Sequence, residues 1–444
     1  MDLIGMFPLF YFPEFGSAWL MGITGTIHIL ASHTSVGAAM LFAFLAHKAY
    51  KENRDDLYDY MKKYGMFLLI FSYVIGSITG PGIWYTATAA SPRGISALIH
   101  NFVWVWATEW VFFVYEVVGV FALVYFIGKI DRKTHLKLTY TFALASLGTL
   151  FLIIGIISFM MWPGNEAFYQ TGSASDGFFG VNTFPHMFLR IGFMIMMSGV
   201  IGLIISSALK DKALSSEMTR KMGVVSLIGG FLTMISFMWY ITTLPESADV
   251  LLELYLPSIV KTRIALIIAF TLYFLVAIFK PQFIKRSLAI VMLAVIAVVG
   301  LWPGEKLRES MRKPYVAGRY IYSNQVIGRD VPGKGIKSEV GIIAANGMLK
   351  VNPWIPDRLR TITPENKLEA GHLLTKIACS NCHGLEPDAK FRPLMDKFAG
   401  QDAATIKAFM QGALATGSIP YMPKIDLPDE EFDAMAAWIA TQNH

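Results

Sequence analysis

Residues 17–46 read SAWLMGITGTIHILASHTSVGAAMLFAFLA, a run of 30 residues that contains no Asp, Glu, Lys or Arg. About 20 mostly apolar residues are enough for a helix to cross the hydrocarbon core of a bilayer. The run is too long for the apolar part of a secretory signal peptide, and no basic leader precedes it. The sequence therefore predicts that this segment is a first membrane-spanning helix.

The composition extends this prediction to most of the chain. Of the 444 residues, 54% are hydrophobic and only 16% are charged, whereas soluble domains carry about 25% charged residues. We therefore expect an all-α fold, a polytopic membrane bundle of about eight helices. The runs that are long and apolar enough are 17–46, 64–83, 98–127, 137–162, 185–209, 221–243, 259–279 and 284–302.

Basic residues gather in the loops after the first, third, fifth and seventh runs, and the opposite loops hold little beyond Arg93 and Lys261. Because Lys and Arg are retained on the cytoplasmic side of a membrane, both termini are expected outside. The net charge of +6 is explained by these inward-facing loops. It therefore gives no reason to expect a nucleic acid as partner.

Both cysteines of the chain lie in Cys379-Ser380-Asn381-Cys382-His383. C-x-x-C-H is the attachment signature of a c-type haem, in which the two thiols form thioethers and the histidine binds the iron. A zinc site would need two more soft ligands, and no other cysteine exists to supply them. A redox dithiol would not need the histidine. The motif therefore predicts one covalent haem c.

The residues after this motif offer a second axial ligand. Met422 lies in Ile419-Pro420-Tyr421-Met422-Pro423, and prolines stiffen such a loop. A methionine thioether is a common partner of histidine on haem c iron. Helical patterns flank the motif on both sides, at 364–378 and 429–440. Residues 361–444 therefore resemble a small class I cytochrome c, and the resemblance covers about a fifth of the chain.

Three domains are expected from these patterns. Residues 1–302 form the membrane domain, and 361–444 form the cytochrome c domain. The connector, 303–360, is too long for an ordinary loop, so it either packs over the outer surface of the bundle or contacts a partner. Haem c is attached on the outer face of a bacterial inner membrane. We therefore expect a multi-pass inner-membrane protein with its cytochrome c domain in the periplasm.

Ionisable residues inside apolar runs are costly, so they are functional hypotheses by default. His28 and Glu109 each lie about eleven residues into their helices, roughly 16 Å deep at 1.5 Å per residue. Two layers of histidines predict two non-covalent haems of type b, one of which could be replaced by haem d. Bonding to a neighbouring helix is the structural alternative for each histidine. The candidate iron ligands, in decreasing order, are His186, His28, His100 and His33.

Glu109 and Glu116 are seven residues apart and therefore lie on one face of the third helix. Proton transfer or contact with a haem is the functional interpretation of these two carboxyls, and structural hydrogen bonding is the alternative.

At these residues the helical part resembles subunit I of the cytochrome bd quinol oxidases, over about 17–279. The resemblance implies that His28 binds a haem of an oxygen-reducing pair and that His186 binds a low-spin, quinol-oxidising haem b. It also implies that Arg263 pairs with a haem propionate and that a second transmembrane subunit is present. The segments that carry it are Ile27-His28-Ile29-Leu30, Thr79-Gly80-Pro81-Gly82, Ala107-Thr108-Glu109, His186 and Thr262-Arg263-Ile264-Ala265.

Three departures from that family matter. Ala265 stands where the family has the axial methionine, so His100 becomes the first candidate partner of the His186 haem. The segment 244–258 is short and lacks the long quinol-binding loop. The family's G-R-Q-P-W motif and the carboxylate ligand before it are missing.

The leading prediction is an oxidoreductase that transfers electrons between membrane quinol and haem c through the b-type haems. The first alternative is a bd-like oxidase that reduces oxygen at a haem near His28, fed by cytochrome c or quinol, with Glu109 and Glu116 delivering protons. The second is a non-catalytic wiring subunit of a larger redox complex. Expected partners are the membrane, the second subunit, and a periplasmic cytochrome or other redox subunits.

Overall fold

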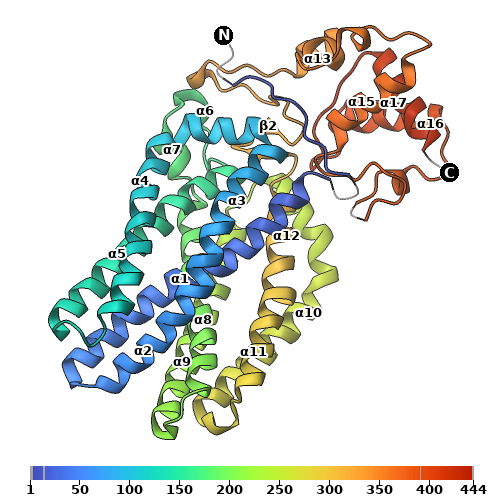
Figure 1. The fold of residues 1–444 in the computed structure, drawn as a ribbon. Helices are drawn as coiled ribbons and strands as arrows, with labels where there is room; N and C mark the ends of the chain where they lie inside the picture. Colours follow the sequence, from blue (N-terminus) through green and yellow to red (C-terminus); the bar gives the residue numbers. More distant parts are fainter. Residues whose placement is uncertain (1–3, 14–15, 391, 443–444) are drawn as a thin grey trace.

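The structure is a computed structural model that describes residues 4–13, 16–390 and 392–442. The secondary structure of its described part is almost entirely helical (Figure 1). The strands there are β1 (Tyr315–Ala317) and β2 (Ile321–Tyr322), which pair antiparallel. Eight helices in the described residues are long and apolar enough to cross a membrane. The predicted all-α bundle of eight spans is confirmed, and the chain is a multi-pass membrane protein.

Six of the spans are formed by single helices and two by helices that contain a π-helical segment. The single helices are α1 (Ala18–Glu52), α4 (Pro92–Phe126), α5 (Arg132–Met161), α8 (Thr183–Ser207), α9 (Lys212–Ile241) and α10 (Glu246–Phe279). The second span joins α2 (Asp55–Leu68), η1 (Leu69–Val74) and α3 (Ile75–Ala90). The eighth joins α11 (Arg286–Val295), η3 (Ile296–Leu301) and α12 (Trp302–Met311).

Shorter elements connect and cap these spans. Between α5 and α8 lie α6 (Ala167–Thr171) and α7 (Ala174–Phe178), and η2 (Pro281–Phe283) follows α10. The segment after α12 holds η4 (Pro332–Lys334), α13 (Val340–Asn346), α14 (Met348–Val351) and η5 (Asp357–Leu359). The C-terminal part holds α15 (Lys367–Cys379), η6 (Met395–Lys397), α16 (Ala403–Phe409), η7 (Met410–Leu414) and α17 (Asp429–Thr441).

The two ends of the bundle differ in what they carry. In Figure 1 the turns α1–α2, α4–α5, α8–α9 and α10–α11 lie at one end, and α15, α16 and α17 lie at the other. The first end carries the basic loops of the sequence, with Arg54, Lys129, Lys210 and Lys280 in its turns. We call the end that carries α15–α17 the distal end.

Local sequence explains where several spans begin. The Asp131 carboxylate accepts a hydrogen bond from Thr134 N at 3.0 Å at the start of α5, and the Asp211 carboxylate caps α9 in the same way. Such side chains satisfy the free N–H groups of a first helical turn. Pro92 is the first residue of α4, a position where its missing N–H costs nothing.

Small residues let α8 pack closely against its neighbours. A Cβ atom at Gly199 would lie 2.2 Å from Ser226 Oγ on α9, and one at Gly37 on α1 would lie 2.0 Å from Met194 O on α8. Close backbone approach at small residues is how membrane helices gain packing contacts without a hydrophobic driving force. These contacts fix α8, which carries His186, beside α1 and α9.

The segment after α12 packs into two hydrophobic cores, one in the bundle and one in the C-terminal part. Val316 and Tyr320 pack with Ala97 and Phe159 at the distal end of the bundle. Further along, Met348 and neighbouring residues pack with the core formed by α15 and α17. The connector therefore packs over the bundle, which is the first of the two positions expected for it.

Candidate functional site

The two cysteines and the histidine of the C-x-x-C-H motif lie on one turn at the end of α15. Cys382 N and His383 N both donate to Cys379 O, at 3.1 and 3.0 Å. Both thiols are free and half-buried. His383 Nδ1 donates to Arg392 O at 3.0 Å, because a carbonyl can only accept. His383 Nε2 therefore carries a lone pair, and the donor set fits a covalently attached haem.

The surroundings of the motif favour the uncharged forms of Cys379 and His383. Burial, and then the neighbouring Cys382, raises the pKa of Cys379 to about 12. Burial is also the main cause that lowers the pKa of His383, and the charges of Arg392 and Lys397 act in the same direction. A neutral imidazole is the form that binds a metal.

Met422, the predicted second axial ligand, follows a turn in which Met422 N donates to Ile419 O at 3.0 Å. Its side chain is half-buried and packs against the C-terminal core, as does Cys379. The structure therefore places Met422 and Cys379 against one core. Its assignment as an iron ligand stays a prediction.

The motif is also attached to the bundle. Asn381 is buried and donates to Ala90 O at the end of α3 at 2.7 Å and to Ser323 O at 2.6 Å. Ser17 N, at the start of α1, donates to Ser380 O at 3.2 Å. The two residues between the cysteines thus contact the second and first spans, so the motif has a fixed position at the distal end.

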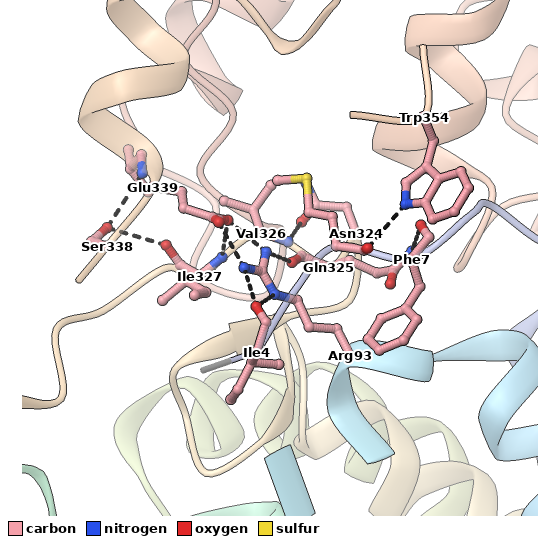
Figure 2. Close-up of polar contacts among 12 residues, drawn as sticks. Ile4, Phe7, Arg93, Asn324, Gln325, Val326, Ile327, Ser338, Glu339 and Trp354 are labelled. Carbon is pink, nitrogen blue, oxygen red and sulfur yellow. Dashed lines mark hydrogen bonds and ion pairs between the residues drawn. The ribbon is translucent and has the colours of Figure 1, made fainter. Parts of the chain in front are cut away.

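A buried arginine ties the remaining distal segments together (Figure 2). Arg93, only 1% exposed, pairs through both terminal nitrogens with both carboxylate oxygens of Glu339, each at 2.7 Å. The same guanidinium donates to Ile4 O and Gln325 O, each at 2.8 Å. Arg93 therefore joins α4 to the connector and to the N-terminal segment.

A second buried arginine joins two of the candidate histidines. Arg190 on α8 donates from Nε to His186 Nε2 at 3.1 Å and from Nη1 to His33 Nε2 at 3.3 Å. It also pairs with Glu305 Oε1 of α12 at 2.8 Å. His186 Nδ1 lies 3.0 Å from Ser158 Oγ. Both ring nitrogens of His186 are therefore engaged, so binding of iron there requires Arg190 to release Nε2.

Sequence reasoning missed Arg190 and Glu305. Arg190 is four residues after His186, so the two side chains lie on one helix face, and this spacing was the available signal. Glu305 falls in the segment expected to be a basic connector, and only the continuation of the eighth span through α12 brings it to Arg190. Its second oxygen pairs with Arg308 Nε at 2.7 Å.

His28 has the arrangement expected of an iron ligand. Its Nδ1 lies 3.1 Å from Thr79 Oγ1, and the Thr79 hydroxyl donates to Ile75 O at 2.7 Å. Because the Thr79 hydrogen is used in that bond, its oxygen accepts from His28 Nδ1–H. Within the described residues the hydrogen bond of the His28 ring involves Nδ1, so Nε2 keeps its lone pair there, and the ring is held by a second residue, as metal-binding histidines are.

His100 lies on the exposed surface of α4, where its Nδ1 donates to Ser96 O at 2.7 Å. Its described hydrogen bonds stay within its own helix. The structure therefore does not bring His100 into contact with His186, and a shared haem stays a prediction.

The two carboxyls of α4 differ in environment. Glu116 is buried beside Ser146 and Thr149 of α5, and its Oε1 makes no hydrogen bond within the described residues. Glu109, seven residues earlier on the same helix, is half-buried. Tyr73, also close to Glu116, lies on η1, and π-helical turns are frequent at functional sites.

Arg263, predicted to pair with a haem propionate, donates from Nη1 to Val299 O at 2.7 Å and to Gly300 O at 3.1 Å. Both carbonyls belong to the π-helix η3. In this structure Arg263 therefore stabilises an irregular turn of the eighth span.

Comparison with known proteins adds a likeness of fold. No family model matches the sequence, and no curated relative matches it either. Among solved structures, bd oxidase from Geobacillus thermodenitrificans superposes with a TM-score of 0.54 at 13% sequence identity, over 74% of this chain and 92% of that chain. This likeness confirms the predicted bd-like fold of the membrane part.

Proposed function

We propose that this chain transfers electrons between membrane quinol and a covalently attached c-type haem at the periplasmic face of a bacterial inner membrane. The observation that carries the proposal is the geometry of Cys379, Cys382 and His383, with His383 Nε2 free and Asn381 bonded to the membrane bundle. The bd-oxidase-like fold supports an oxidoreductase that works in the respiratory chain.

In the C-terminal part, Cys379 and Cys382 attach the haem, and His383 and Met422 bind its iron. When bound there, the haem supplies a one-electron carrier. Arg392 O orients the His383 ring, and Asn381 holds the motif at the end of α3. These bonds keep the carrier in a fixed position relative to the bundle.

In the bundle, His28 and His186 are the first candidates for two haems, of type b or with one of type d. His28 Nε2 is free, whereas Arg190 must release His186 Nε2. Once released, Arg190 offers a guanidinium to a haem carboxylate, a role that sequence reasoning assigned to Arg263. A second transmembrane subunit and a periplasmic redox partner complete this proposal.

A second function is favoured by a specific observation. His28 has a free, oriented Nε2, and Glu116 on α4 has a buried oxygen without a partner in the described residues. An iron site at His28 together with carboxyls that move protons would suit oxygen reduction. In that case electrons would enter from the c-type haem.

A reduced-minus-oxidised optical spectrum of the purified complex, repeated under carbon monoxide, separates the two functions. Six-coordinate b and c haems that do not respond to carbon monoxide would support the quinol–cytochrome function. A carbon monoxide shift would identify an open iron site and support oxygen reduction. Absence of a covalent haem after denaturation would overturn the main proposal. Haems without quinol oxidation would instead indicate a wiring subunit.

A further inference from the structure

The end of α12 holds a buried cation without a full partner. The Lys313 side chain is 8% exposed, and its Nζ lies 3.7 Å from Glu309 Oε1, too far for a hydrogen bond. Nζ makes no hydrogen bond within the described residues. Glu309 is already paired with Arg312, whose Nη2 lies 2.6 and 2.7 Å from its two oxygens. A buried ammonium of this kind is costly unless an anion accompanies it.

A second cation lies beside it in the loop after the C-x-x-C-H motif. Arg392 has a left-handed backbone with a φ of 43°, and its carbonyl accepts from His383. Its guanidinium donates to Ser310 Oγ of α12 at 3.0 Å, three residues before Lys313. Within the described residues Arg392 forms no ion pair with a carboxylate. Lys313 and Arg392 therefore converge on the side of the motif that faces α12.

Both cations lie close to His383. Arg392 O accepts from His383 Nδ1, and the Arg392 guanidinium donates to Ser310 Oγ, three residues before Lys313. The charges of Lys313, Arg392 and Lys397 all act on His383. Lys397 is exposed, so water satisfies its charge. Lys313 therefore shares a single carboxylate with Arg312 at a long distance, and within the described residues Arg392 has no carboxylate partner.

We propose that Lys313 and Arg392 bind the two propionate carboxylates of the haem attached at Cys379 and Cys382. This inference rests on the proposed function. Two carboxylates match two cations, and both arginine and lysine bind such groups through charge-assisted hydrogen bonds. The segment just after the membrane helix α12 thereby contributes a cation to the haem site of the C-terminal part, and Ser310 of α12 holds the other.

The two cations also affect the redox equilibrium. Oxidation adds a positive charge to the iron, and nearby cations disfavour that charge. They also hold the propionates ionised, because an opposite charge favours the charged form of a carboxyl. Removing one cation should therefore lower the midpoint potential and raise a propionate pKa.

The test measures the haem c midpoint potential between pH 5 and 8 in the full-length holoprotein. Lys313→Gln and Arg392→Gln should each keep the covalent haem, shift the potential downwards and make it more dependent on pH. Lys313→Arg should restore the wild-type profile. Lys306→Gln is the matched control, because Lys306 is an exposed lysine on α12, the helix that ends just before Lys313, and it should match the wild type.

Potentials and pH profiles of Lys313→Gln and Arg392→Gln that equal those of Lys306→Gln would overturn the inference. If Lys313→Gln does not accumulate as folded protein, the midpoint potential of Arg392→Gln tests the inference by itself. Arg392 lies in a half-buried loop, where a substitution is easier to accommodate. Wild-type protein without haem staining on a denaturing gel would overturn the proposed function itself. That result is distinct from a normal haem content with unchanged potentials.

Discussion

The hydrogen-bond partners of each histidine decide which of its nitrogens is free for iron. His383 and His28 donate from Nδ1 to an oxygen and leave Nε2 free. His186 instead accepts a hydrogen bond from Arg190 at Nε2. The residue type is the same in all three cases, so the neighbouring donor or acceptor makes the difference.

Replacing Thr79 by Val removes the oxygen that orients His28 while keeping the shape of the side chain. We expect a haem held at His28 to bind about 10–100-fold more weakly, the usual effect of losing such a supporting residue. Haem content per protein and the optical spectrum measure this. Thr24→Val is the control, because the Thr24 hydroxyl donates to Leu20 O, a carbonyl of its own helix. Equal haem content in both variants would remove His28 from the ligand set.

Asn381 offers a second prediction for a single residue. Asn381→Ala leaves the carbonyls of Ala90 and Ser323 without a donor at a buried site, which costs about 1–3 kcal/mol. The thermal unfolding midpoint of the full chain in detergent should fall. Asn346→Ala is the control, because Asn346 is exposed and donates to Ile342 O of its own helix, so its effect should stay within about 0.5 kcal/mol. Similar losses in both variants would contradict a role for Asn381 in docking.

At the level of elements, the eighth span shows how an irregular helix is stabilised. The π-helix η3 leaves backbone carbonyls poorly paired inside a membrane helix, where unsatisfied groups are expensive. Arg263 on α10 donates to two of them, Val299 O and Gly300 O. The arginine thus holds α10 against the eighth span and supports the turn that leads into α12.

Arg263→Leu should therefore destabilise the bundle by about 1–3 kcal/mol through the unpaired carbonyls. Haem-depleted and haem-loaded protein should lose the same amount if Arg263 acts on η3 alone. A loss seen only in the loaded form, accompanied by a shifted haem potential, would instead support the propionate role expected from sequence. Arg220→Gln is the control, since Arg220 is exposed and its bond to Ile278 O is long at 3.4 Å.

For the whole molecule, the arrangement of bundle, connector and C-terminal part depends on a few long-range bonds. Arg93 makes several of these bonds and joins segments more than 200 residues apart in sequence. Its bidentate pair with Glu339 is buried, so the remaining charge would be uncompensated if one partner were removed.

Arg93→Gln should cost about 3–5 kcal/mol, the usual penalty for breaking a buried ion pair. Limited proteolysis should then cut the connector faster while the eight spans stay intact. Arg358→Gln breaks an exposed pair with Glu369 and should leave stability nearly unchanged. Unchanged proteolysis of Arg93→Gln would show that apolar packing alone holds the connector.

The sequence by itself determined the eight spans and the C-x-x-C-H motif, and its basic loops predict on which side the termini lie. Length and hydropathy are sufficient for a spanning helix, because the bilayer supplies the surroundings that a soluble core would have to build. The excess of Lys and Arg in alternate loops likewise predicts the orientation of the spans, whatever the packing of the helices. The bd-like bundle could therefore be predicted before any contact was known.

Only the tertiary structure decided how the polar groups combine. Glu305 and Arg308 look like parts of a charged loop in the sequence, yet Arg190 of α8 pairs with Glu305 and makes the helix α12 part of the buried network. In the same way, the roles proposed for Asn381 and Lys313 depend on residues that lie far away in the sequence. The physical reason is that hydrogen bonds and ion pairs are directional and short-ranged, so they depend on packing that no local pattern records.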